Sequence, residues 1–191
     1  TDVRTGVSVA SIETAGGAAR AVLTTGGERI AADLVLVGIG VEPELRLAAE
    51  AGLVCDNGIV VDEPARTSDP AIVAAGDCTR HPNPLLGRTL RLETVHNAVQ
   101  QAKTAAATLC GVGRPYAQTP WFWSDQLGHR LQGVGLAAHG CRTVVRGDPA
   151  SGRFAVWCFD GERLTGCQAV NRPAEYIACR RMLDNGLLPS P

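Results

Sequence analysis

The feature that most constrains the fold is a pair of short, unbroken apolar runs that each end at glycine. The first run is Asp33–Gly40, and the second, Ala71–Ala75, is closed by Gly76 and Asp77. A strand buried on both faces of a parallel sheet typically reads as such a run, without polar alternation. We therefore predict an α/β region in which both runs are buried strands.

The residues around these runs predict further short elements. Alternating apolar and polar side chains indicate strands, and glycine pairs and prolines indicate the turns between them. The predicted elements are strands at Val7–Glu13, Arg20–Thr25 and Gly58–Asp62, a short helix at Leu45–Ala51, a proline-rich loop at 80–88 and a long helix at Glu93–Leu109. The first strands are expected to form a meander that returns to a doubly wound sheet.

A change in composition at Gly111–Pro115 predicts a domain boundary, and all three Trp residues lie beyond it. The pattern there indicates an antiparallel sheet and one closing helix, which is an α+β module. The predicted strands are Arg130–Gly135, Arg142–Arg146, Phe154–Phe159 and Leu164–Val170, and the helix is Pro173–Asn185.

Composition excludes several classes of protein. The formal net charge of the 191 residues is -1, which argues against nucleic acid or an anionic membrane as a partner. No apolar run approaches the roughly 18 residues of a spanning helix, and the N-terminus does not resemble a signal peptide. We interpret that N-terminus as a cut edge. Seven irregularly spaced cysteines without a C-x-x-C pair indicate reduced thiols in the cytoplasm and no metal site.

The segment Thr67–Asp77 has the layout of a ligand site. The end of a strand reaches the edge of the sheet, where α/β proteins bind ligands. Gly76 would allow the backbone to approach a cofactor closely, and Asp77 would offer a carboxylate to ligand hydroxyl groups. A strand that ends in a common Gly-Asp turn is the alternative interpretation.

Thr67–Asp77 resembles the second FAD fingerprint of the flavoproteins with two dinucleotide domains. Three other segments resemble ferredoxin and putidaredoxin reductases, including those of aromatic-ring dioxygenase and P450 systems: Arg91–Ala102, Pro120–Gln126 and Ala169–Asn171. The resemblance implies the end of a doubly wound NAD/FAD-binding region followed by a C-terminal antiparallel-sheet domain. It divides the chain into the end of the NAD-binding domain (1–42), the C-terminal part of the FAD-binding domain (43–112) and an interface domain (113–191).

The same resemblance implies site residues. Asp77 would bind the ribityl chain of FAD beside Gly76. Val95 would lie against the flavin with Glu93 and Thr94 close by, where the N–H groups and partial positive charge of the helix N-terminus would stabilise the anionic reduced ring. An ordinary packed helix is the alternative.

Two further positions complete the expected site. In the related reductases the position of Trp123 is near the flavin and the electron exit, although core packing is the usual role of a tryptophan. The loop that ends at Gly40 would approach the nicotinamide of NAD(H), although a tight turn explains it equally well. No catalytic nucleophile and no metal ligand are expected.

The chain has no true dinucleotide-binding glycine loop. Gly133–Ala138 matches G-x-G-x-x-A in letters, but the residues that follow predict a strand and turn where a helix is required. Both phosphate-binding loops would therefore lie outside these residues, and we expect this chain alone to bind no flavin and to be inactive.

The resulting hypothesis is an FAD-dependent ferredoxin–NAD(+) reductase that passes electrons from NADH through FAD to a [2Fe-2S] ferredoxin. Acidic ferredoxins would be attracted by the basic cluster Arg80, Arg88 and Arg91, which a solvated loop also explains. A related NADH oxidase, a nitrite-reductase-type flavoprotein and a non-catalytic dimerisation or docking module remain alternatives. Homodimer formation is left open.

Overall fold

The computed structural model describes residues 2–84, 87–137 and 140–187. The chain divides into two compact units, Thr1–Val41 and Glu42–Pro191. The finer division into an FAD-binding part and an interface domain, with a boundary near residue 113, stays a prediction. None of the helices in the described ranges has the length and apolar character needed to cross a membrane.

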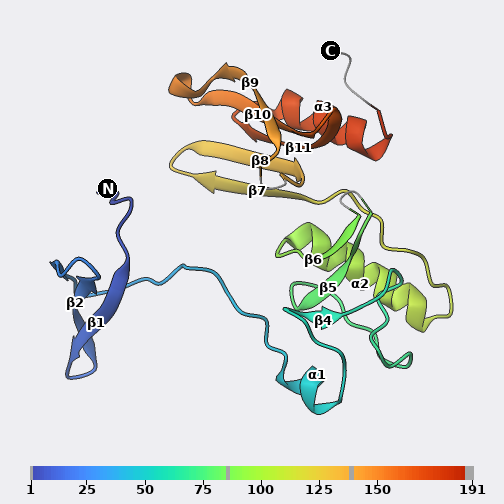
Figure 1. Cartoon of the computed structure of the whole chain (residues 1–191), viewed down its shortest axis with the longest axis horizontal. Coiled ribbons are helices and arrows are strands. Elements are labelled where there is room, and N and C mark those ends of the chain that lie inside the picture. The colour runs from blue at the N-terminus through green and yellow to red at the C-terminus, as the bar shows by residue number, and fades with distance from the viewer. Residues whose placement is uncertain (1, 85–86, 138–139, 188–191) are drawn as a thin grey trace. The chain divides into compact units, whose positions relative to one another are not determined.

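The first unit is the expected meander. The antiparallel strands β1 (Val9–Ala15), β2 (Ala18–Thr24) and β3 (Arg29–Ala31) are hydrogen-bonded in sequence order (Figure 1). The β1–β2 connection is Gly16-Gly17, with φ values of 61° and 79°. Such left-handed conformations strain other residues, so the glycine pair explains the tight turn.

The prediction of a buried strand at Asp33–Gly40 is wrong. The segment contains no strand, and the side chains of Leu34, Leu36 and Ile39 are 86%, 95% and 92% exposed. A strand of a parallel sheet needs hydrogen-bonded neighbours and cover on both faces. None of the described residues supplies a neighbouring strand for this segment.

The second unit begins with α1 (Arg46–Glu50) and a small mixed sheet. In that sheet β5 (Thr79–Asn83) lies between β4 (Ile59–Val60), which is parallel to it, and β6 (Arg88–Arg91), which is antiparallel. The predicted helix and the predicted strand around residue 60 are confirmed, each in shortened form.

The second apolar run is not a strand either. It forms a single bridge, between Val73 and Arg66, and a hydrogen-bonded turn precedes it, in which Thr67 N donates to Ile72 O at 3.0 Å. The true strand, β5, lies in the predicted proline-rich loop, of which residues 85–86 are outside the described part. Pro82 lies beyond the two residues of β5 that pair with β4, so no bond to that neighbour is lost to its missing N–H.

The long helix α2 (Val95–Leu109) is confirmed and follows the small sheet. Most of the apolar stripe that identified it in the sequence faces outward, since Val95 and Leu109 are 62% and 67% exposed, although Ala105 of that stripe is buried. The buried face is largely polar and includes Asn97 and Gln101, both fully buried. Burying amides is costly unless they are hydrogen-bonded, so this face must have specific partners.

The C-terminal part is a five-stranded antiparallel sheet with the order β7-β8-β11-β10-β9 (Figure 1). The four predicted strands and the closing helix are confirmed, and β7 adds a fifth strand. The elements are β7 (Trp121–Gln126), β8 (His129–Gly135), β9 (Arg142–Asp148), a 3-10 turn (Pro149–Ser151), β10 (Arg153–Asp160), β11 (Arg163–Val170) and α3 (Pro173–Asp184). Gly133 and Gly135 lie inside β8, as expected for a strand; Ala138 is outside the described residues.

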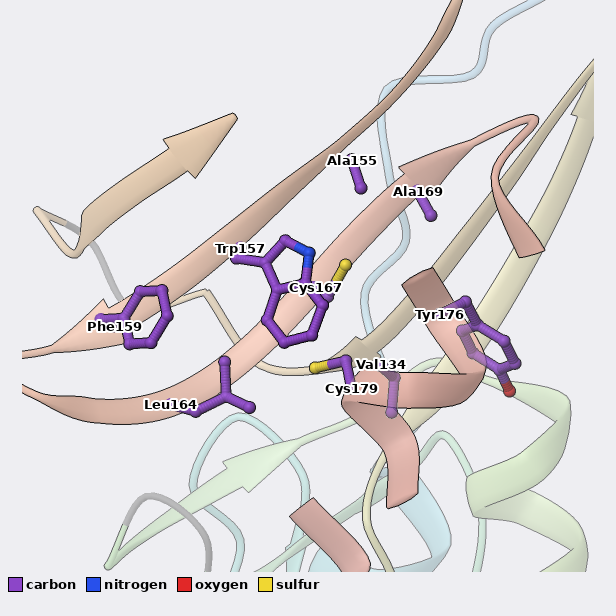
Figure 2. Close-up of a cluster of buried hydrophobic side chains, with 9 residues drawn as sticks. All are labelled: Val134, Ala155, Trp157, Phe159, Leu164, Cys167, Ala169, Tyr176 and Cys179. Carbon is purple, nitrogen blue, oxygen red and sulfur yellow. The ribbon is translucent and has the colours of Figure 1, made fainter. Parts of the chain in front are cut away.

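The main hydrophobic core lies between this sheet and α3, as Figure 2 shows. Trp157 of β10 lies at its centre and donates from Nε1 to the buried carboxylate of Glu175 on α3 at 3.0 Å. That carboxylate also binds Arg172 at 2.9 Å and Arg146 at 3.5 Å. One buried acid thus joins the helix to two strands of the sheet.

Candidate cofactor-binding site

The predicted fingerprint ends in a tight turn from Gly76 to Thr79. Thr79 N donates to Gly76 O at 3.0 Å, and Gly76 has a φ of 94°. Within the described part of the chain, a Cβ added at Gly76 would meet only Ala98 of α2, at an ordinary 3.8 Å. Glycine is therefore required here by the left-handed backbone conformation and not by lack of space.

The turn is hydrogen-bonded to the polar face of α2. Gly76 N donates to Gln101 Oε1 at 2.8 Å, and the Thr79 hydroxyl lies 2.7 Å from the same oxygen and 2.8 Å from Gly76 O. Only the carbonyl oxygen of an amide can accept from an N–H, so the Gly76 donor determines how the Gln101 amide is oriented. Gly76, Thr79 and Gln101 are all buried, which protects these bonds from water.

Arg91, at the end of β6, holds the other side of the turn. Its Nη1 donates to Asp77 O at 3.2 Å and forms an ion pair with Glu93 Oε1 at 2.6 Å. The Arg91 side chain is only 13% exposed, which makes this pair less screened than a surface pair. Arg91 thus links the predicted site residue Asp77 to Glu93, immediately before α2.

The helix itself begins at a regular N-cap. Thr94 has an extended backbone, and its hydroxyl accepts from Asn97 N at 3.1 Å. The first N–H groups of a helix have no partner within it and carry a partial positive charge. The side chains of Val95 and Asp77 are exposed, and within the described residues nothing binds the Asp77 carboxylate. The arrangement offers a free carboxylate and a helix N-terminus, joined through Arg91, to a polar ligand.

An aromatic cluster joins the first turn of α2 to β7. The His96 and Trp121 rings are 5.2 Å apart, and the Trp121 and Trp123 rings are 5.6 Å apart, so both Trp side chains lie on one face of the strand as predicted. Trp123 is 43% exposed, whereas Trp121 is also covered by the Arg180 guanidinium at 5.4 Å. The partly exposed indole of Trp123 is therefore the last ring in a series of contacts that runs from His96 through Trp121.

His96 is the titratable member of this cluster. Burial is the main cause that lowers its pKa below the ordinary value of 6.5, and the positive charge of Arg180 lowers it further. His96 Nδ1 and Trp121 Nε1 are buried without a hydrogen-bond partner in the described structure. Loss of the proton is therefore favoured at His96, and its ring packs against Trp121.

The predicted basic cluster is mostly neutralised. Arg80 forms an ion pair with Asp56, and Arg91 forms the pair with Glu93. Arg88 is exposed on β6 and has no ion pair within the described ranges. The ion pairs of Arg80 and Arg91 reduce the net positive charge of the predicted cluster, and its role in attracting an acidic ferredoxin stays a prediction.

The structure brings most of the predicted site residues together but not all of them. Gly76 and Asp77 are joined to the α2 N-terminus, and Trp123 is connected to the first turn of α2 through Trp121. Gly40 belongs to the other compact unit, where it has a φ of 102° and, among the residues that the structure describes, no neighbour within 4 Å of an added Cβ.

Two residues that anchor the turn, Gln101 and Arg91, were not predicted from the sequence to do so. No role was predicted for Gln101, and Arg91 was predicted only as a member of the basic cluster. The polar side chains Asn97, Gln101 and Thr108 recur at helical spacing, which is a signal for a second face of α2. Nothing in the sequence indicates that this polar face, rather than the apolar stripe, is the buried one.

Comparison with known proteins gives two family matches. Residues 1–102 match the model of the pyridine nucleotide-disulphide oxidoreductase family, and residues 121–191 match the model described as reductase C-terminal.

Two curated relatives extend over nearly the whole chain. The rhodocoxin reductase of Rhodococcus erythropolis is 48% identical over 181 residues, which are 95% of this chain and 42% of the relative. The putidaredoxin reductase of Pseudomonas putida is 42% identical over 192 aligned residues, covering 100% of this chain and 46% of the relative. The chain thus spans less than half the length of these relatives.

Solved structures give the same result. A ferredoxin reductase from Rhodopseudomonas palustris is 40% identical with a TM-score of 0.91, covering 97% of this chain and 46% of the other. The reductase in a covalent putidaredoxin reductase–putidaredoxin complex is 42% identical with a TM-score of 0.91, covering 96% of this chain and 45% of the other.

Proposed function

Because the chain belongs to the pyridine nucleotide-disulphide oxidoreductase family, we propose that it supplies one half of the flavin site in an FAD-dependent reductase. In this reductase, electrons pass from NADH through FAD to a [2Fe-2S] ferredoxin. The observation that carries the proposal is the exposed, unbound carboxylate of Asp77, in a turn whose backbone carbonyl oxygen at Asp77 is bound by Arg91, which also pairs with Glu93 just before the capped N-terminus of α2.

The residues of the turn fit the sugar-alcohol part of FAD. The Asp77 carboxylate has acceptors only, so it suits the hydroxyl groups of a ribityl chain. Hydrogen bonds to a charged acceptor contribute about 1.5–3 kcal/mol. Gly76 has no side chain that could block a ligand from this carboxylate, and its φ of 94° sets the direction of the backbone in the turn.

The N-terminus of α2 fits the flavin ring. When bound, FAD would supply hydride acceptance from NADH and release of single electrons. The first N–H groups of α2 stabilise negative charge on a neighbouring ring edge, and Thr94 keeps the helix end ordered. Exposed Val95 supplies an apolar surface for the ring, and Glu93 keeps Arg91 in place.

Trp123 fits a position at the edge of the flavin on the side of the electron acceptor. Its indole is partly exposed and packs against Trp121, whose own ring is covered by the Arg180 guanidinium. Proteins named putidaredoxin reductase, and a complex of that reductase with putidaredoxin, support a ferredoxin as the acceptor. Of the basic cluster, Arg88 alone is proposed to attract an acidic partner.

The finer architecture belongs to this proposal as well. Residues 1–42 would form the end of a doubly wound NAD-binding region, with Gly40 near the nicotinamide. The remainder would complete the FAD-binding domain and form the C-terminal antiparallel-sheet domain. The seven cysteines are all free thiols in the structure, which supports a reducing, cytoplasmic location.

The test compares Asp77→Ala with Asp160→Ala in the full-length protein. Asp160 is an exposed acid at the end of β10 and serves as the control. We expect Asp77→Ala to weaken FAD binding at least about tenfold, the equivalent of one lost charge-assisted hydrogen bond. Equal FAD affinities of the two variants would remove the assigned role of Asp77.

Stopped-flow reduction by NADH then tests the acceptor. Electron release that accelerates with added [2Fe-2S] ferredoxin supports the reductase, whereas release to oxygen at a rate indifferent to ferredoxin favours an NADH oxidase. A visible spectrum of the 191-residue chain tests whether it is a half-site. Stoichiometric bound flavin in that chain would contradict the half-site.

A further inference from the structure

We propose that Gln101 is a positioning residue for the flavin site. It holds the Gly76–Asp77 turn against α2 and so determines where the Asp77 carboxylate lies relative to the helix N-terminus. The inference rests on the proposed function, because it takes the turn and the helix end as the two protein groups that contact FAD.

One oxygen atom makes this connection. Gln101 Oε1 accepts from Gly76 N at 2.8 Å, and the Thr79 hydroxyl lies 2.7 Å from it. Gly76 N is the backbone donor of the residue immediately before Asp77. Without Gln101, a buried N–H would lose its partner, and such groups move toward water or another acceptor. The turn would then leave its present position.

Gln101 acts through the turn and not by contact with the cofactor. Its side chain is 0% exposed, and Nε2 is buried without a partner within the described structure. The next residue of the turn, Asp77, is exposed and reaches solvent. A ligand can therefore contact Asp77, whereas Gln101 is covered by the protein itself.

The helix α2 fixes the position of the Gly76–Asp77 turn relative to the helix N-terminus. Gln101 and Thr94 are seven residues apart on α2, which corresponds to about 10 Å along the axis. A helix of this length behaves as a rigid body, so the Gly76 hydrogen bond sets the distance between the turn and the N-cap. Arg91 connects the same two groups from the other side through Asp77 O and Glu93, which leaves the turn little freedom.

The experiment uses three variants and two measurements. Gln101→Met keeps the shape of the side chain but lacks the acceptor, and Gln101→Glu keeps an acceptor. Gln100→Met is the matched control, because Gln100 is half-buried on the same helix and makes none of these bonds. The first measurement is hydrogen exchange of the Gly76 amide in the 191-residue chain by NMR. The second is the dissociation constant of FAD in the full-length apoprotein.

We expect Gln101→Met to accelerate Gly76 exchange and to raise the FAD dissociation constant, each by about tenfold. Gln101→Glu should restore both values toward wild type, and Gln100→Met should leave both unchanged. A merely structural Gln101 would lower stability without changing FAD affinity in the folded protein. The inference is overturned if Gln101→Met and Gln100→Met have the same Gly76 exchange rate or the same FAD dissociation constant.

Failure of the proposed function has a different signature. Wild-type full-length apoprotein that binds no FAD would refute that function and this role together, even with Gly76 protected by Gln101. If Gln101→Met does not fold, Thr79→Val replaces it, because it removes the hydroxyl that shares the oxygen. The same outcomes then apply with a smaller loss of about threefold.

Discussion

Glu175 offers the sharpest test of how the C-terminal unit is held together. Its carboxylate is buried between α3 and the sheet, where it accepts from Trp157 Nε1 at 3.0 Å and pairs with Arg172 at 2.9 Å. Trp157 is a core residue that is only 5% exposed. Replacing Glu175 by alanine would leave its indole N–H without a hydrogen-bond partner. We therefore expect a large loss of stability from a single substitution.

The magnitude follows from the individual contacts. The hydrogen bond from Trp157 to a charged acceptor accounts for about 1.5–3 kcal/mol. The side chains of Arg172 and Arg146 are 34% and 59% exposed, so solvent screening limits each of their pairs with Glu175 to about 0–1 kcal/mol. The sum for Glu175→Ala is about 1.5–5 kcal/mol. With a urea dependence of about 2 kcal/mol per molar, the unfolding midpoint should fall by about 0.8–2.5 M.

Urea unfolding followed by tryptophan fluorescence is the suitable assay. All three Trp residues lie on β7 and β10, so the signal reports on this sheet. Glu175→Gln, which keeps an acceptor for the indole but loses the charge, should fall between wild type and Glu175→Ala. Glu162→Ala, an exposed acid in a turn, is the control. If Glu175→Ala and Glu162→Ala unfold at the same urea concentration, the buried carboxylate does not hold the helix to the sheet.

Two other substitutions test the region of the site. Thr94→Ala removes the N-cap hydroxyl and should lower the free energy of unfolding by about 1 kcal/mol in chemical denaturation. The control is Thr143→Ala on the exposed strand β9, and equal unfolding free energies of the two variants would exclude a capping role for Thr94. His81 is 1% exposed, and burial lowers its pKa below 6.5, so the unfolded chain binds the proton more readily. The stability that neutral His81 contributes is present above pH 6.5 and is lost as the pH falls below that value, by up to about 1.4 kcal/mol per pH unit. In urea titrations between pH 8 and 5.5, His81→Phe should therefore reduce the dependence of the unfolding free energy on pH. An unchanged dependence would exclude His81 as its source.

Local patterns determined the elements that are stabilised by their own neighbours. The glycine pair at 16 and 17, the turn residues Asp160 and Gly161 between β10 and β11, and Pro173 at the start of α3 each carry a complete local signal. The fingerprint around Asp77 is only partly local, because its residues are consecutive but the predicted strand Ala71–Ala75 does not form and the turn is held by Gln101 and Arg91. Hairpin strands and capped helices pair mainly with adjacent residues, and therefore their sequences predict them.

Tertiary partners decided the rest. The apolar run Asp33–Gly40 has the composition of a buried strand, but within the described residues it has no sheet to join and stays exposed. On α2, the sequence offers both an apolar and a polar face. The hydrogen bonds of Gln101 to Gly76 and of Asn97 to Tyr116 are the reason that the polar face is buried. Periodicity identifies the faces of a helix, but the partner that satisfies buried amides lies far away in the sequence, so only the folded chain could show which face is inside.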